Sequence, residues 1–275
     1  MGAREPQAVT HFVCVTCGVQ FAASESPPPR CPVCEDERQY VPESGQQWTT
    51  LEAVGEDHAN RIAAEGELTA IGTEPKFAIG QRALLVPWAE RQLMWDCVTL
   101  LDDDTAEEVE RRGGLAAIAI SHPHYYSTMV EWGRRFGCPV YLHADDAEWI
   151  MRPDPVIEQW EDERKDLGDG LTLIRCGGHF AGGTVLHWAG GANGRGALLS
   201  GDIVQVIQDR RHVGFMYSYP NLIPLPAAAV EAIAAALEPF AFEALYGAWW
   251  GTVIEDGKGA VERSAARYVR ALSSG

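Results

Sequence analysis

The sequence predicts an α/β protein preceded by a small cysteine-rich module. From residue 48 onward, short apolar runs bounded by Gly, Pro or charged residues alternate with amphipathic segments, which is the pattern of strands interleaved with helices. Before that point, four of the seven cysteines fall within residues 14–34. The chain has 275 residues, and at ~150 residues per domain this length suits one large domain with a small companion. We therefore predict a module at residues 1–47 and a main domain at residues 48–275.

The charge and the hydrophobic content of the chain indicate which kinds of partner it can bind. Hydrophobic residues make up 46% of the chain, and 22 Lys and Arg against 39 Asp and Glu give a net charge of −17. So acidic a surface repels phosphate backbones, and we expect no nucleic-acid partner. No apolar run reaches the ~18 residues needed to cross a bilayer, and residues 1–7 are too polar for a signal sequence. We therefore expect a cytoplasmic protein that does not bind membranes.

The four N-terminal cysteines form two Cys-x-x-Cys pairs with thirteen residues between them. Each pair offers two thiolates from one tight turn, and together they can form the closed tetrahedral shell that Zn²⁺ or iron takes. Disulfides are disfavoured in a reducing compartment. We predict one metal ion held by Cys14, Cys17, Cys31 and Cys34.

Gly18, Phe21 and the Cys-Pro-x-Cys second pair resemble both zinc ribbons and rubredoxin. The acidic run at 35–37 does not reproduce the glycine that follows the second pair in rubredoxin, so zinc is favoured and iron is the alternative. So small a module lacks a sufficient core, and the metal is expected to stabilise its fold. The polar stretch 42–47 is predicted to be the linker that ends the module.

The main domain is predicted to run through strands and helices in two halves. It begins with an Ala- and Glu-rich helix over 50–66, and a second helix over 104–112 is stopped by Gly113 and Gly114. The dipeptide Asn193-Gly194 predicts a turn between two later strands. The predicted strands cover 68–71, 83–88, 92–98, 115–120, 139–143, 171–176, 184–189, 197–206 and 244–246, and the other helices cover 127–136, 227–237 and 260–272.

Three histidines and an aspartate stand out as a set. His122 and His124 directly follow the strand at 115–120, and their i, i+2 spacing places both imidazoles on one side, as in a chelating pair. His179 lies in a glycine-bordered loop, and Asp202 follows Gly201 after a later strand. Imidazole and carboxylate groups are common ligands of zinc and iron.

The order and intervals of these residues resemble those of the metallo-β-lactamase superfamily over roughly residues 50–275. The resemblance implies an αββα sandwich in which His122, His124, His179 and Asp202 hold a metal ion. Asp96 resembles the aspartate that orders the ligand loop.

The chain departs from the superfamily at its second metal site. The hallmark His-x-His-x-Asp-His reads His-Pro-His-Tyr-Tyr-Ser here, so Tyr126 and Ser127 replace two ligands. No histidine follows His212, and the segment with Trp249 and Trp250 occupies the place of the last ligand. The resemblance therefore implies one metal ion in the active site.

The catalytic candidates are Asp202, Tyr125 and Tyr126. Asp202 can act as a base if it moves partly off the ion. A phenol beside a metal can donate a hydrogen bond to an oxyanion, and packing of a tyrosine in the core is the alternative. Residues 214–226 are too apolar for a solvated loop and too rich in Pro for a helix, so this segment is predicted to line the site. His143 is predicted to support a ligand rather than to bind the metal, although the sequence leaves the second role open. The predicted substrate contacts are Tyr217, Tyr219, Asn221 and Trp250.

The preferred function is a mononuclear zinc hydrolase, in which metal-bound hydroxide attacks a small ester, lactone, thioester or amide. It requires one Zn²⁺ in the active site and one in the ribbon, and a small-molecule substrate. Two alternatives remain. Iron in either site would make an oxygenase or redox protein, with the rubredoxin-like module delivering electrons. A catalytically silent protein would use the metal sites and the ribbon for binding alone.

Overall fold

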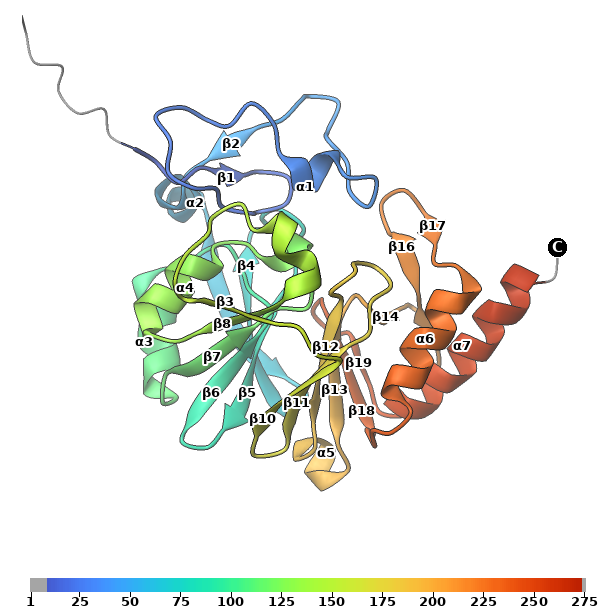
Figure 1. Ribbon diagram of the computed structural model, residues 1–275. Helices are drawn as coiled ribbons and strands as arrows, with labels where there is room; N and C mark the ends of the chain where they lie inside the picture. Colours follow the sequence, from blue (N-terminus) through green and yellow to red (C-terminus); the bar gives the residue numbers. More distant parts are fainter. Residues whose placement is uncertain (1–8, 274–275) are drawn as a thin grey trace, which may run out of the picture.

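Two β-sheets face each other between outer layers of helices in the computed structural model, which describes residues 9–273 (Figure 1). A small N-terminal module lies across one end of this sandwich (Figure 1). The predicted αββα architecture with an N-terminal four-cysteine module is therefore confirmed. The described part of the chain has no helix that is both long and apolar enough to cross a membrane.

The first sheet has seven strands in sequence order. Its first four strands pair antiparallel, and the pairings from β6 to β9 are parallel. The strands are β3 (Ala59–Glu65), β4 (Leu68–Glu74), β5 (Ala83–Trp88), β6 (Arg91–Trp95), β7 (Leu115–Ala119), β8 (Val140–His143) and β9 (Ile157–Trp160).

The second sheet has six strands in the order β10-β11-β12-β13-β18-β19. Only the β13–β18 pairing is parallel. The strands are β10 (Arg164–Gly168), β11 (Leu171–Arg175), β12 (Thr184–Trp188), β13 (Ala197–Gly201), β18 (Ala244–Gly247) and β19 (Val253–Ile254).

Helices cover the outer face of each sheet. α3 (Asp103–Arg111) and α4 (Met129–Phe136) lie against the first sheet, and α6 (Ala227–Leu237) and α7 (Gly257–Ser273) lie against the second (Figure 1). The shorter elements are α1 (Pro32–Glu35), α2 (Leu51–Asp57), α5 (Gly191–Gly194), β1 (Val13–Cys14), β2 (Trp48–Thr49), β14 (Gln205–Val206), β15 (Val213–Gly214), β16 (Met216–Ser218), β17 (Ile223–Pro224) and two 3-10 turns, Pro123–Tyr125 and Ala144–Trp149.

The side chains of each sheet alternate between two cores. On β5, Leu84 and Val86 face the second sheet, whereas Leu85 packs under the helices and the ribbon. The inter-sheet core contains Leu68, Leu84, Leu93 and Trp95 of the first sheet and Leu171, Leu186 and Leu199 of the second. The sandwich thus holds the ends of β7, β11 and β13 in a fixed arrangement.

The ribbon, residues 9–47, is packed onto the main domain. Its buried cysteines share one hydrophobic cluster with Met129 and Val130 of α4. Arg152 NH1 donates to Glu131 Oε1 at 2.5 Å and also to the Gln20 side chain of the ribbon. The predicted boundary after residue 47 falls directly before β2, which pairs with β1 across it. The division into two domains stays a prediction.

Three local predictions were wrong. The predicted strand 92–98 ends at Trp95, because Asp96 has a φ of 60°. The predicted helix over 50–66 ends at Asp57, because Ala59–Glu65 pairs residue by residue with β4, and this pairing overrides the helix propensity of Ala and Glu. The predicted strand 197–206 stops at Gly201, whose φ of 55° breaks it before Asp202. The polar strands β9 and β10 were missed because they lack an apolar run.

Candidate functional site

The ends of β6 and β7 position the first two histidines. Asp96 follows β6 with a φ of 60°, and its Oδ1 accepts a 2.8 Å hydrogen bond from the backbone N–H of Ser121. His122 caps the 3-10 turn that carries His124, and both side chains are buried. Asp96 thus orders the ligand loop as the resemblance implied.

His179 reaches the same place from the loop between β11 and β12. The two preceding glycines have φ of 66° and 81°, in the left-handed region that glycine adopts without strain. His179 Nδ1 donates to the backbone carbonyl of Tyr217 at 2.7 Å. This bond leaves the lone pair of Nε2 directed away from Tyr217, toward the other histidines.

The three imidazoles converge. One nitrogen of each of His122, His124 and His179 lies within 4.8 Å of the others, and His179 Nε2 is 3.2 Å from His124 Nδ1. Asp202 follows β13, and its Oδ1 lies 3.2 Å from His122 Nε2. His122 Nε2 and Asp202 Oδ1 are both buried, and neither has a hydrogen-bond partner of standard geometry among the described residues. A pair of facing, unpartnered ligand atoms fits a metal ion.

Burial sets the charge of these groups. It lowers the pKa of His179 to about 4 and lowers the pKa values of His122 and His124 well below their usual range. All three imidazoles are therefore neutral at pH 7, which is the form that binds metal. Burial and the nearby charge of Asp96 raise the pKa of Asp202 to about 7, whereas the Tyr125 hydroxyl lowers it.

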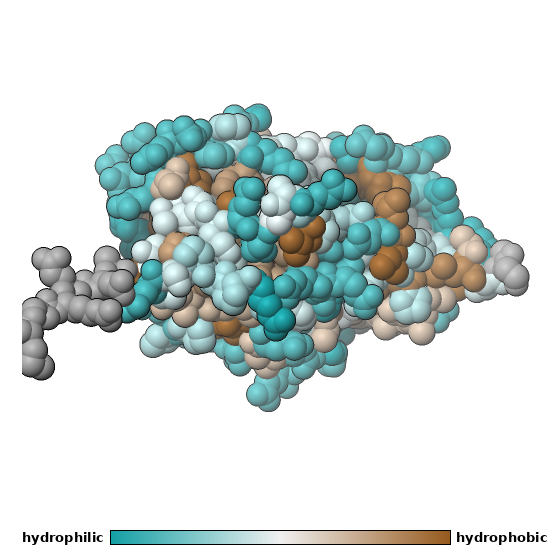
Figure 2. Space-filling model, turned by 90° about the horizontal axis from the view of Figure 1, so that it is seen from above, coloured by the Kyte–Doolittle hydropathy of each residue, from teal (hydrophilic) through white to brown (hydrophobic). Residues whose placement is uncertain are grey.

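A cavity of about 210 Å³ opens beside the cluster. Its wall is built from the main domain and from the ribbon. The lining residues are Thr16, Arg38, Gln39 and Tyr40 of the ribbon, with Lys76, Ala78, Ile79, His124, Tyr125, His179, Asp202, Tyr219, Pro220 and Trp249. Around this end of the molecule, the surface is mostly hydrophilic with separate hydrophobic patches (Figure 2).

The structure separates the two catalytic candidates. Tyr125 lines the cavity, its ring centroid lies 4.3 Å from that of His122, and its buried hydroxyl has no partner of standard geometry within residues 9–273. Tyr126 instead lies beside Val19 and Gln20 of the ribbon. Successive residues of the turn thus point to different sides.

The predicted substrate contacts also differ in placement. Tyr219 lines the cavity, and its hydroxyl donates to the backbone carbonyl of Asp202 at 2.7 Å. Tyr217 and Asn221 contact the ribbon: the Tyr217 hydroxyl donates to Glu37 Oε1 at 3.3 Å, and Asn221 Nδ2 donates to the Glu37 backbone carbonyl at 2.9 Å. Their roles toward a substrate stay predictions.

The tryptophan pair is split between two surroundings. Trp249 lines the cavity, whereas the ring of Trp250 lies 4.4 Å from the guanidinium carbon of Arg61. Trp249 therefore lines the cavity, and Trp250, which the sequence analysis gave as a substrate contact, does not.

The positions that would hold a second ion carry other contacts. Ser127 Oγ accepts a 3.1 Å hydrogen bond from Gln81 Nε2. His143 lies outside the histidine cluster: its Nδ1 accepts from the Asp145 backbone N–H at 3.1 Å, and its Nε2 lies 3.3 Å from the Asp162 carbonyl.

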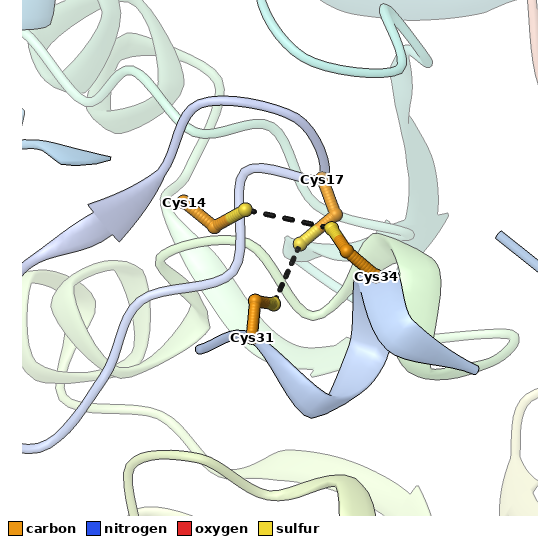
Figure 3. Close-up of side chains that lie close together, drawn as sticks. All are labelled: Cys14, Cys17, Cys31 and Cys34. Atoms are coloured by element: carbon orange, nitrogen blue, oxygen red, sulfur yellow. Dashed lines mark hydrogen bonds between the residues drawn. The ribbon is translucent and has the colours of Figure 1, made fainter. Parts of the chain in front are cut away.

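The four ribbon cysteines point toward one another around a common centre (Figure 3). Cys14 Sγ lies 3.5 Å from Cys34 Sγ, and Cys17 Sγ lies 3.8 Å from Cys31 Sγ. A tetrahedron with Zn–S bonds of ~2.3 Å has edges of ~3.8 Å, so this spacing fits a tetrathiolate site and is far too long for disulfides. Gln46 Nε2 donates to Cys14 Sγ at 3.1 Å.

Sequence reasoning missed Arg38. Its NH1 donates to the His179 backbone carbonyl at 3.3 Å, and its guanidinium carbon lies 4.0 Å from the Phe180 ring centroid. The only signal was its position just after the second cysteine pair, which by itself indicates nothing about a histidine 141 positions along the chain.

Comparisons with known proteins agree with this geometry. The chain is 51% identical over 267 residues to the uncharacterized protein YmaE of Bacillus subtilis (strain 168), covering 96% of this chain and 97% of that protein. The metallo-beta-lactamase VMB-1 matches 77% of this chain and 97% of its own with a TM-score of 0.58 and 14% identity. The metallo-beta-lactamase FIM-1 from Pseudomonas aeruginosa, in its mono-zinc form, matches 76% and 96% with a TM-score of 0.55 and 14% identity.

No protein-family model matches the sequence. The identity to YmaE extends over both the ribbon and the sandwich, whereas the solved structures share only the fold. The chain therefore belongs to the family of the Bacillus subtilis protein YmaE and has the metallo-β-lactamase fold with an N-terminal four-cysteine ribbon.

Proposed function

We propose that the protein is a mononuclear zinc-dependent hydrolase that acts on a small ester, lactone, thioester or amide. The observation that carries the proposal is the convergence of three neutral, buried imidazoles with Asp202 at the wall of a cavity. The mono-zinc form of FIM-1 supports a one-ion site on this fold.

His122, His124, His179 and Asp202 are the residues that would hold the ion. Bound zinc supplies Lewis-acid chemistry: it lowers the pKa of a coordinated water toward ~7 and polarises a carbonyl. The protein orients the ligands: Ser121 Oγ lies 2.9 Å from His122 Nδ1, and the Tyr217 carbonyl accepts from His179 Nδ1. Burial raises the pKa of Asp202 to about 7 in the metal-free protein, so a proton and the metal ion compete for this carboxylate near neutral pH.

The cavity wall indicates how a substrate would be oriented. Tyr125 presents a buried hydroxyl that lies near Asp202 without a hydrogen bond of standard geometry and can donate to a substrate oxygen. Burial and the charge of Asp202 keep its pKa well above the usual value, so it stays protonated. Ile79 and Trp249 make part of the wall apolar. A cavity of about 210 Å³ suits a small, partly hydrophobic substrate.

Replacing Tyr125 by phenylalanine is expected to lower kcat by a factor of ~10²–10³, because it removes one donor to a developing oxyanion. The matched control is Tyr126→Phe, which removes a phenol that faces the ribbon and should leave kcat near the unmodified value. Steady-state kinetics with metal content measured in parallel distinguishes the two. Equal kcat values for both variants would exclude this role for Tyr125.

The function itself is tested with a panel of ester, lactone, thioester and amide substrates, run beside metal quantification. We expect turnover that is lost with a chelator and restored by Zn²⁺. Turnover that survives complete removal of metal would refute the proposal, and iron bound at the histidine cluster would favour the oxygen-activating alternative.

A further inference from the structure

Arg38 joins the ribbon to the loop that carries His179. Its NH1 donates to the His179 backbone carbonyl, and its guanidinium covers the ring of Phe180, the next residue of that loop. The side chain is only 13% exposed, although Arg38 is a charged residue of the smaller module. A planar, buried guanidinium holds its partners in one orientation.

The cysteine site fixes where Arg38 lies. Cys34 is part of α1, and the C-cap residue of this helix, Asp36, closes it with a 3.1 Å hydrogen bond from its N–H to the Pro32 carbonyl. Arg38 Nε and NH2 bind the two carboxylate oxygens of Asp36 at 2.5 and 2.9 Å. Three residues therefore separate a cysteine of the cluster from Arg38, and one of them, Asp36, is hydrogen-bonded both to the helix and to the guanidinium.

The β16–β17 hairpin completes the connection. Ser218 Oγ donates to the Arg38 carbonyl at 3.1 Å, and the preceding residue, Tyr217, supplies the carbonyl that orients the His179 imidazole. Arg38 and His179 are thus held by the same short segment. Displacement of the ribbon would loosen the backbone of His179 and the acceptor of its ring at once.

We propose that Arg38 is a positioning residue that couples the two metal sites, so that a filled four-cysteine site tightens metal binding at the histidine cluster. The inference rests on the proposed assignment of a metal ion to that cluster. Because coupling between two binding sites is reciprocal, an ion at the histidine cluster also tightens binding in the ribbon.

The test uses the full chain, stripped of metal and titrated with Co²⁺ against a chelator. The sulfur-to-cobalt charge-transfer band reports the ribbon. Because a cobalt tetrathiolate also absorbs in the visible, the histidine cluster is followed in the difference spectrum that remains after the spectrum of cobalt-loaded His179→Ala, scaled to the same charge-transfer band, is subtracted. Arg38→Met should weaken cobalt binding at the histidine cluster by a factor of ~10–100, the usual effect of removing a group that orients a ligand, and should change its visible spectrum. The charge-transfer band at saturating cobalt should remain, which shows that the ribbon still folds.

The matched control is Arg152→Met, which removes the other buried arginine of the ribbon interface without touching the His179 loop. It should lower the melting temperature and leave cobalt affinity at the histidine cluster within about twofold of the unmodified protein. Unchanged affinity in Arg38→Met, or an equal loss in Arg152→Met, would overturn the coupling role. If the unmodified protein takes up no cobalt at the histidine cluster, the proposed function fails, and this inference with it.

Discussion

Replacing His179 by alanine is expected to reduce the metal content from two ions per chain to one and to abolish turnover. The three imidazoles approach within 4.8 Å of one another, and removal of one leaves two histidines and a carboxylate whose pKa is already about 7. Such an incomplete shell competes poorly with protons and water for the ion. Mass spectrometry of the native protein gives the metal count, and the active substrate of the panel gives the turnover.

The control for this experiment is His212→Ala. His212 is a histidine outside the cluster, with Nδ1 3.1 Å from Asp209 Oδ2, and its removal should change neither metal content nor kcat. If His179→Ala is folded and still holds two ions with full turnover, the metal is bound elsewhere and the site is misassigned.

Replacing Cys31 by serine is expected to remove the ribbon ion and to destabilise the whole protein. The ribbon cysteines lie in the same buried cluster as Met129 and Val130 of α4, so loss of the ribbon exposes part of the core of the main domain. Loss of a structural metal typically lowers the free energy of unfolding by about 4 kcal/mol or more. In a chain of this size, that loss corresponds to a fall in Tm of roughly 8–16 °C. Differential scanning calorimetry measures the shift.

Cys138→Ser provides the comparison, because Cys138 is a buried free thiol outside the ribbon and its replacement should cost far less. A Cys31→Ser protein that is as stable as the unmodified one, yet has lost all turnover, would contradict the structural role. Electron transfer through an iron-loaded ribbon would then be the better explanation.

The cysteine cluster and the pair His122 and His124 could be predicted because their signals are local, whereas His179 and Asp202 were indicated only by the resemblance to the metallo-β-lactamase superfamily. Paired cysteines and the His-x-His pair are short-range patterns, and a fixed geometry follows from each of them. Strands and helices could also be predicted where their ends carry clear signals. β7 is an apolar run that follows two glycines, and α3 begins with acidic residues and ends before Gly113. These features needed no knowledge of distant contacts.

What the sequence did not predict depends on contacts between distant segments. Tyr125 and Tyr126 are neighbours with the same side chain, and only the 3-10 turn decides which one faces the cavity. Residues 59–65 have a helical composition but form an edge strand because β4 pairs with them. The contact of Arg38 with the His179 loop depends on how the ribbon packs against the main domain, and the sequence gives no signal for that packing.

The most direct test of the account is the number and kind of metal ions in protein purified without added metal. We expect two zinc ions per chain, one removable by His179→Ala and the other by Cys31→Ser. Three or more tightly bound ions would contradict the claim that Tyr126, Ser127 and Trp250 leave the fold with a single active-site metal. If the unmodified protein holds only one ion and His179→Ala holds the same one ion, the histidine cluster is not a metal centre.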